Sequence, residues 1–144
     1  MELVVKHFKA LSLEELYEIL RVRAAVFVVE QTCVYQDLDE KDQSAYHVFL
    51  KDDKGIKAYL RVLDKGVSYE EASIGRVLTV DRGCGLGEKI VTEGIKVAKE
   101  KFQADRIRIS AQLYAKGFYE KAGFKQVSDE YLEDGIVHVA MVLE

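Results

Sequence analysis

The chain has 144 residues, of which 32% are charged, and its formal net charge is −4. It has no basic tail and no apolar stretch near the ~18 residues that would cross a bilayer, so nucleic acid and membranes are not expected partners. Its two cysteines, Cys33 and Cys84, have no C-x-x-C spacing and indicate a reducing compartment rather than a disulfide framework. We therefore expect one soluble, cytoplasmic domain over residues 1–144.

The first half of the chain predicts one helix and four strands. Residues 3–8 have strand composition, and Ser12 followed by Glu15 has the spacing of a capping box. Apolar residues then recur at helical spacing as far as Phe27. Further strands are predicted over residues 46–50, 58–63 and 73–80, with a hairpin turn at residues 52–55 between the first two.

The second half predicts two helices on either side of a strand. Residues 89–102 predict a helix whose buried stripe consists of Ile90, Val91, Ile95, Ala98 and Phe102. Residues 106–111 alternate between polar and apolar, as a half-buried strand does. A short helix over residues 113–122 is then expected to stop at Gly123.

The chain closes with a predicted hairpin. Asp134 and Gly135 supply the positive φ values of a two-residue turn, which would pair residues 124–132 with residues 136–143. The resulting order, β-α-β-β-β-α-β-α-β-β, predicts a mixed α/β fold.

The most informative segment leads from the strand at residues 73–80 into the next helix through Gly83, Gly85 and Gly87. Glycines tolerate positive φ, so successive N–H groups can point into one concavity beside a helix N-terminus. The spacing of a Walker loop fails because Glu88 stands five residues beyond Gly83, and that of a dinucleotide loop fails because Glu88 and Ile90 occupy its third-glycine positions. By itself the segment fits a phosphate site and an empty strand-to-helix turn equally well.

Two segments together resemble the GCN5-related N-acetyltransferase (GNAT) family. Residues 82–87 are similar to its acyl-CoA loop, and residues 112–124 are similar to its F-Y-x-x-x-G-F helix, one strand later. Residues 26–31, 74–77 and 133–138 further resemble the ElaA-like branch. The resemblance implies a mixed, mostly antiparallel sheet of about seven strands with flanking helices. Its fourth and fifth strands would splay apart to admit the pantetheine arm of acetyl-CoA.

The resemblance also implies an activity and a set of contacts. The chain would move an acetyl group from acetyl-CoA directly to an amine acceptor, a small molecule or a peptide, without a metal. The link from the fourth strand to Arg82 is shorter than usual in the family, which leaves the pantetheine register open by a residue or two. The implied cofactor-binding residues are Leu78, Thr79, Val80, Arg82, Gly83, Cys84, Gly85, Leu86, Gly87, Gln112 and Tyr119.

Direct transfer to an amine poses two proton problems. The amine must lose a proton, and the departing thiolate benefits from gaining one. Tyr119 is the expected acid, since its helix should aim the phenol at the sulfur. The glutamate that many relatives carry on the fourth strand is absent from residues 74–76. Glu30 and His47 are therefore nearly equal candidates for the base, His138 is a third, and a water chain is the alternative.

Other interpretations stay open at this stage. The fold could serve as a non-catalytic acyl-CoA sensor or interaction module, the loop could bind a nucleotide, and a homodimer is compatible with the sequence. Tyr114 and Phe118 are expected to pack in the core. An acidic loop, expected either to attract a cationic amine or to be merely solvated, contains Asp37, Asp39, Glu40 and Asp42.

Overall fold

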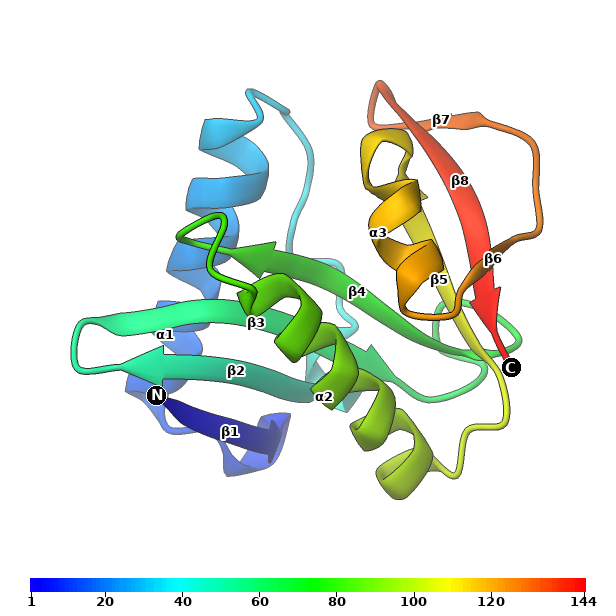
Figure 1. Cartoon of the computed structure of the whole chain (residues 1–144). Helices are drawn as coiled ribbons and strands as arrows, with labels where there is room; N and C mark the ends of the chain where they lie inside the picture. Colours follow the sequence, from blue (N-terminus) through cyan, green and yellow to red (C-terminus); the bar gives the residue numbers. More distant parts are fainter.

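The computed structural model describes residues 1–144 and contains one mixed eight-stranded sheet (Figure 1). The strands are β1 (Glu2–His7), β2 (Tyr46–Asp52), β3 (Gly55–Leu63), β4 (Ala72–Thr79), β5 (Ile107–Gln112), β6 (Lys125–Gln126), β7 (Tyr131–Glu133) and β8 (Ile136–Leu143). Their order is β1-β2-β3-β4-β5-β8-β6, and β7 also pairs with β8. The helices are α1 (Leu13–Arg23), α2 (Leu86–Phe102) and α3 (Lys116–Lys121).

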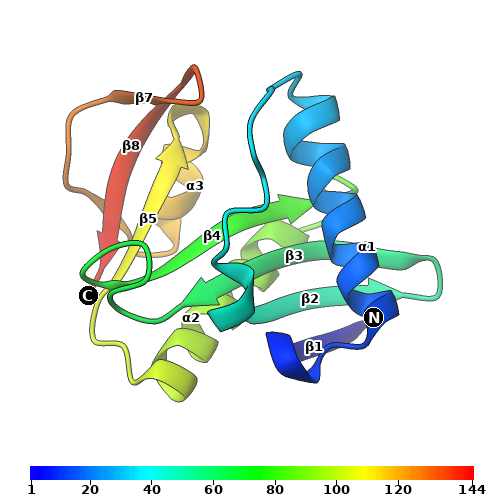
Figure 2. The ribbon, with the colours of Figure 1, turned by 180° about the vertical axis from the view of Figure 1, so that it is seen from behind.

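The sheet is split into two halves because β4 and β5 touch at one end alone. Their parallel register pairs Ala72 with Ile107 and Ser73 with Arg108, and the strands then diverge (Figures 1 and 2). All other neighbouring strands are antiparallel. The antiparallel ladder between β3 and β4 is interrupted by a bulge at Arg76, whose φ is 55°. Since a bulge bends its strand and increases its twist, it helps to carry β4 away from β5.

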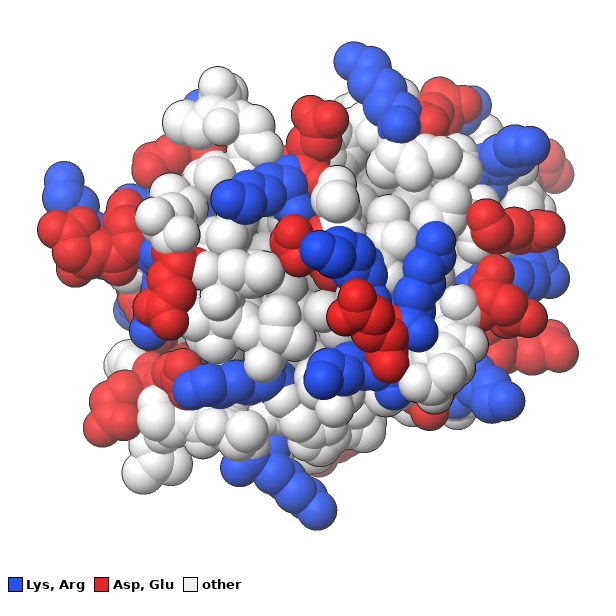
Figure 3. Space-filling view, turned by 60° about the horizontal axis from the view of Figure 1, so that its bottom comes forward, with Lys and Arg blue, Asp and Glu red and all other residues white.

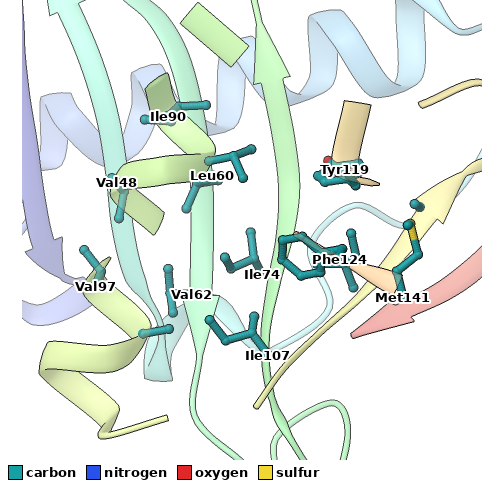
Figure 4. Packing of buried hydrophobic residues seen from close by; sticks show 14 of the residues in the cluster. Val48, Leu60, Val62, Ile74, Ile90, Val97, Ile107, Tyr119, Phe124 and Met141 are labelled. Carbon is teal, nitrogen blue, oxygen red and sulfur yellow. The ribbon is translucent and has the colours of Figure 1, made fainter. Parts of the chain in front are cut away.

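Helices cover both faces of the sheet. Figure 1 shows α2 and α3 on one face, and Figure 2, from behind, shows α1 across the other. The larger apolar cluster lies under α2 and α3; Figure 4 shows Ile90 and Val97 of α2 beside Val48, Leu60 and Val62. A smaller cluster lies under α1. Because both faces are covered, β2 and β3 have runs of consecutive buried residues rather than an alternation of buried and exposed ones.

Most of the predicted elements are present, with different ends. The capping box of Ser12 and Glu15 is formed at the start of α1. The α-helix itself ends at Arg23, and a π-helical segment, η2 (Ala24–Glu30), continues it past Phe27. The first arm of the closing hairpin, predicted over residues 124–132, is divided into β6 and β7. Asp134 and Gly135 make the expected turn, with φ values of 51° and 77°. No helix is both long and apolar enough to span a membrane.

The second helix, α2, starts earlier than predicted, and its buried face differs from the predicted one. It begins at Leu86, and its buried residues are Ile90, Val91, Gly94, Val97 and Ala98, whereas Ile95 and Phe102 are half-buried. Gly94 explains the difference, since a Cβ there would lie 2.8 Å from the side chain of Leu60. The glycine therefore lets α2 lie close against β3.

Candidate active site

A cleft lies between the two halves of the sheet, where β4 and β5 diverge. One wall is β4 around its bulge, and the other is β5 with the 3₁₀ turn η4 (Leu113–Ala115) and α3. The end of η2 and the β7–β8 turn close its sides. Apolar and aromatic residues make up just over half of the lining, and the polar groups that converge on the cleft include those of Ser110, Gln112, Tyr119 and His138. A cleft that combines apolar side chains with convergent polar groups is a usual form of a small-molecule site.

The glycine-rich loop carries the chain from β4 into α2. Gly83 and Gly85 have φ values of 78° and 73°, which favour glycine. The first helical hydrogen bond runs over 3.2 Å from the N–H of Lys89 to the carbonyl of Gly85, so the amides of residues 86–88 have no helical partner. A Cβ at Gly87 would lie 3.4 Å from the ring of Phe118, so this turn lies against α3. The free amides have the geometry of an anion-binding helix N-terminus.

The edge of β4 offers fewer free groups than the sequence suggests. The N–H of Val80 donates to the carbonyl of Lys57 over 2.9 Å, so Val80 is paired with the neighbouring β3 side of the sheet. Backbone groups alternate along an antiparallel strand, and Leu78 therefore also faces β3 while Thr79 faces the opening. Of the expected contacts Leu78, Thr79 and Val80, Thr79 is the one whose backbone lies toward the cleft.

Tyr119 on α3 lies in the core and also lines the cleft. Its ring packs edge-to-face on Phe118 and Phe124, at centroid distances of 5.1 and 5.9 Å. Burial, with a smaller effect from Tyr114, raises the pKa of Tyr119 well above its ordinary value. The phenol therefore stays protonated at neutral pH, and its hydroxyl makes no hydrogen bond within the protein. Its position suits both packing and proton donation to a ligand.

The prediction that Tyr114 and Phe118 pack together is wrong for Tyr114. That side chain is 79% exposed, whereas Phe118 is half-buried against the larger apolar cluster. The spacing of four residues indicates a shared face only within one α-helix. Tyr114 lies in the 3₁₀ turn η4, before α3 begins, so the rule does not apply to it.

The structure brings Glu30 to the glycine-rich loop rather than to the cleft wall. Its carboxylate pairs with the guanidinium of Arg82, and both side chains are more than half exposed. Gln31, the next residue, lines the cleft in its place. Arg82 and Cys84 of the loop are themselves exposed. Glu30 is therefore placed to influence ligand binding at Arg82.

His47 does not reach the cleft, because β2 holds it in the protein interior with no exposed surface. Nε2 lies 3.0 Å from the carbonyl oxygen of Asp42, so this nitrogen carries the proton and donates. Nδ1 lies 2.7 Å from the hydroxyl of Tyr59 and accepts from it. Burial also lowers the pKa of His47. The expectation that His47 acts as a base is corrected on this geometry, since both ring nitrogens are engaged.

Gln112 lies at the end of β5, and its side-chain amide donates to the Oε1 atom of Gln31 over 3.3 Å. This contact closes one side of the cleft. The buried residues of β5 are Ile107, Ile109 and Ala111, so Gln112 belongs to the alternate set, on the face away from α3.

The aspartates of the acidic loop are neither solvated nor free to attract a cationic substrate, whereas Glu40 is exposed. Asp37 and Asp42 are buried, at 6% and 7% exposure, and the loop's three aspartates are paired with three arginines. Arg23 donates to Asp42 over 2.6 Å and to Asp37 over 3.0 Å. The other two arginines come from the sheet, Arg61 from β3 and Arg76 from the bulge of β4. The network fixes the loop against β3 and β4, beside the cleft.

A second polar cluster on the cleft consists of His138, Glu133 and Ser110, which the sequence did not group together. Nε2 of His138 lies 3.5 Å from Oε2 of Glu133, and Oγ of Ser110 lies 3.2 Å from the other carboxylate oxygen. The predicted Asp134-Gly135 turn could have indicated this grouping, because it places Glu133 opposite Ile136 and Tyr131 opposite His138. On this register Glu133 and His138 share one face of the hairpin as diagonal neighbours.

Charge is mixed on one face of the molecule. On the face shown in Figure 3, Lys and Arg lie interspersed with Asp and Glu, without a continuous patch of one sign. This face therefore offers an anion no broad basic surface.

A splayed mixed sheet with a glycine-rich turn into α2 defines the class of acyl-CoA N-acyltransferase folds. Residues 10–144 match the family model of the acetyltransferase (GNAT) domain, and the chain therefore belongs to the GNAT family as an ElaA-like member. Membership in this family indicates acyl transfer from an acyl-CoA.

Relatives and solved structures agree over the full length of the chain. A UPF0039 protein, C11D3.02c of Schizosaccharomyces pombe, is 39% identical over 100% of this chain and 97% of its own. ElaA of Escherichia coli is 34% identical over 96% of this chain and 93% of its own, and its crystal structure superposes with a TM-score of 0.93. The crystal structure of an acyl-CoA N-acyltransferase from Pseudomonas aeruginosa gives 0.94, at 34% identity and 100% coverage of both chains.

Proposed function

We propose that this chain is an N-acetyltransferase that transfers an acetyl group from acetyl-CoA directly to an amine of a small molecule or peptide. The observation that carries the proposal is the cleft between β4 and β5, which has the phenol of Tyr119 on its wall and the free α2 amides beside α3. A pyrophosphate needs clustered donors, and an extended pantetheine arm needs an open strand edge. A departing thiolate needs a proton. Each requirement has a group in this arrangement.

The chain's own groups divide the work. The amides of residues 86–88 would hold the pyrophosphate with charge-assisted hydrogen bonds, helped by the dipole of the 17-residue helix α2. The backbone of Thr79 would bond the pantetheine arm along the open edge of β4. Tyr119 would donate its proton to the sulfur as the C–S bond breaks. Both cysteines are free and Cys84 is exposed, which fits a reducing cytoplasmic setting.

A non-catalytic acyl-CoA sensor is the second candidate. It is favoured by one observation, namely that neither Glu30 nor His47 stands on the cleft wall as a base. Such a module would use the same loop and the same strand edge but would release no thiol.

The proposal is tested by binding and turnover in parallel. Calorimetry with coenzyme A and with ATP identifies the ligand of the loop, and the release of free thiol from acetyl-CoA is followed across a panel of primary amines. We expect binding of coenzyme A and amine-dependent thiol release. Binding without release from any amine would favour the sensor, and tight binding of ATP without binding of coenzyme A would contradict both.

A further inference from the structure

The cluster of His138 and Glu133 lies on the side of the cleft opposite Tyr119. In β5, Ile107, Ile109 and Ala111 are buried in the cluster under α2 and α3. The alternate residues face the other way, and His138 pairs in register with one of them, Gln112. Tyr119 reaches the cleft from α3. The two groups that can exchange protons thus approach the cleft from opposite faces of the β5–β8 half-sheet.

One hydrogen bond sets the tautomer of His138. Its Nδ1 lies 2.7 Å from the carbonyl oxygen of Ile136, an atom that can only accept, so Nδ1 carries a proton. In the neutral ring the lone pair is therefore on Nε2. Since His138 lines the cleft and is 6% exposed, the ring is held in a fixed orientation with this nitrogen free to accept a proton.

A chain of hydroxyl groups orients Glu133 toward that nitrogen. Oγ of Ser110 donates to Oε1 of Glu133 over 3.2 Å, so Ser110 accepts from the hydroxyl of Tyr131, 2.5 Å away. Oε2 of Glu133 then lies 3.5 Å from Nε2, and these two acceptor atoms are bridged when a proton lies between them. Tyr131 also stacks on the imidazole, with the ring centroids 6.1 Å apart. Every partner thus holds the carboxylate and the ring in one relative position.

We propose that His138 and Glu133 form the proton acceptor for a primary ammonium substrate, a step that rests on the function proposed above. Glu133 binds the ammonium group, whose N–H proton passes to Nε2 of His138, and the carboxylate stabilises the imidazolium. The neutral nitrogen attacks the thioester carbonyl, forming the C–N bond as the C–S bond breaks. The nitrogen loses its second proton as the amide forms, and this proton returns through solvent to the phenolate of Tyr119, which gave its own proton to the thiolate. The carboxylate of Glu133 is 47% exposed and returns the first proton to water.

This pair has what the other base candidates lack. His47 has both ring nitrogens engaged in the interior, and Glu30 is occupied by Arg82 outside the cleft. The other ionisable side chains that line this cleft are Cys33, Tyr35, Arg76, Tyr114, Tyr119 and Asp134. Tyr131 stacks on His138, and Tyr69 lies near Glu133. Arg76 is committed to Asp37 and Asp39, which leaves the Glu133 carboxylate available to a cation.

The test compares two acceptors that differ in their need for a base. Thiol release from acetyl-CoA is measured with primary alkylamines, which are protonated at neutral pH, and with hydroxylamine, which is largely neutral there. His138→Asn keeps an amide N–H near the position of Nδ1, for the bond to Ile136, and removes the accepting nitrogen. Glu133→Gln preserves shape at a half-exposed site. His7→Gln, on the edge strand β1, is the matched control.

We expect His138→Asn to lower kcat with alkylamines by about 10²-fold or more, the usual size of general base catalysis, and with hydroxylamine by less than about tenfold. Glu133→Gln should show the same preference with a smaller loss, while the affinity for coenzyme A stays unchanged in both variants. Equal losses with the two acceptors, or no loss, would overturn the assignment of the pair. A wild-type chain that binds acetyl-CoA but acts on neither acceptor would instead overturn the proposed function.

Discussion

Arg76 at the bulge of β4 and Asp37 in the loop after η2 form an ion pair, with Nε of Arg76 2.8 Å from Oδ1 of Asp37. The same carboxylate accepts from the fully buried Arg23 through its other oxygen, over 3.0 Å. Arg76 has a positive φ of 55°, so the pair holds a strained residue of the cleft wall against the loop. The geometry of the cleft thus depends on a buried charge network.

Asp37→Asn is expected to lower the free energy of unfolding by about 3–5 kcal/mol, because it leaves a buried guanidinium short of one negative charge. Glu93→Gln is the control, since its pair with Lys96 is 3.7 Å long on the helix surface and should be worth less than ~0.5 kcal/mol. Urea unfolding measures both. A loss for Asp37→Asn no larger than that for the control would contradict the role of the network.

The same network predicts acid sensitivity. Burial alone would raise the pKa of Asp42, but hydrogen bonds and charge from Arg23 and Arg61 outweigh burial and lower it. The pKa of Asp39 is lowered in the same way by Arg61 and Arg76. The unfolded chain, with an aspartate pKa of about 3.9, binds more protons than the folded chain once the pH falls near that value. This contribution to stability is therefore complete above about pH 5 and lost as the pH falls through the folded pKa values.

Urea unfolding at a series of pH values from 7 down to 3 checks this. The free energy of unfolding should decline below about pH 5, and Asp42→Asn should show a shallower decline from a lower starting value. An identical acid slope in the variant and the wild type would rule out Asp42 as a source of the acid sensitivity.

Gly85→Ala tests the loop. With φ at 73° and no atom within 4 Å of the added Cβ, the substitution costs backbone strain alone, about 1–2 kcal/mol. It should also weaken the binding of coenzyme A severalfold, because the amides of the first turn are displaced. Gly117→Ala in α3 has equal space and no positive φ, and is expected to gain about 0.5–1 kcal/mol. Urea unfolding and calorimetry with coenzyme A measure both variants. Equal changes in stability and in affinity for the two substitutions would contradict the role of Gly85.

Tyr119→Phe separates proton donation from packing. The phenol makes no hydrogen bond within the protein, so its loss should leave stability within ~0.5 kcal/mol while lowering kcat by about 10²-fold. Calorimetry should give an unchanged affinity for coenzyme A. The exposed Tyr114→Phe is the control and should keep its turnover. Equal kinetics for Tyr119→Phe and the wild type would leave Tyr119 as a packing residue.

Glu30→Gln tests whether this carboxylate acts on the loop or on the acceptor. Removal of its charge frees Arg82 for the ligand, so the affinity for coenzyme A should rise by about two- to fivefold at low salt, and salt should abolish the gain. The change in kcat is expected to be smaller than the change in affinity. A fall in kcat of about 10²-fold at unchanged affinity would return Glu30 to the role of base.

Much of the fold could be predicted from the sequence where it depends on interactions between neighbouring residues. The capping box of Ser12, the alternation of β5 and the Asp134-Gly135 turn depend on near neighbours, and all three are formed. The arginine network could not be predicted, because it joins the acidic loop to Arg23, Arg61 and Arg76 from three separate elements. Whether His47 is a base or an interior histidine could not be decided from the sequence for the same reason, since α1 and the acidic loop, which cover β2, are distant from it in the chain.

The central claim concerns one ligand in one cleft, and a crystal structure with coenzyme A measures it most directly. We expect the pyrophosphate on the amides of residues 86–88 and the pantetheine arm beside Thr79. The thiol should lie between β4 and β5, within hydrogen-bond distance of the Tyr119 hydroxyl. A loop that stays empty, or a thiol that lies outside the opening of the sheet, would contradict the account.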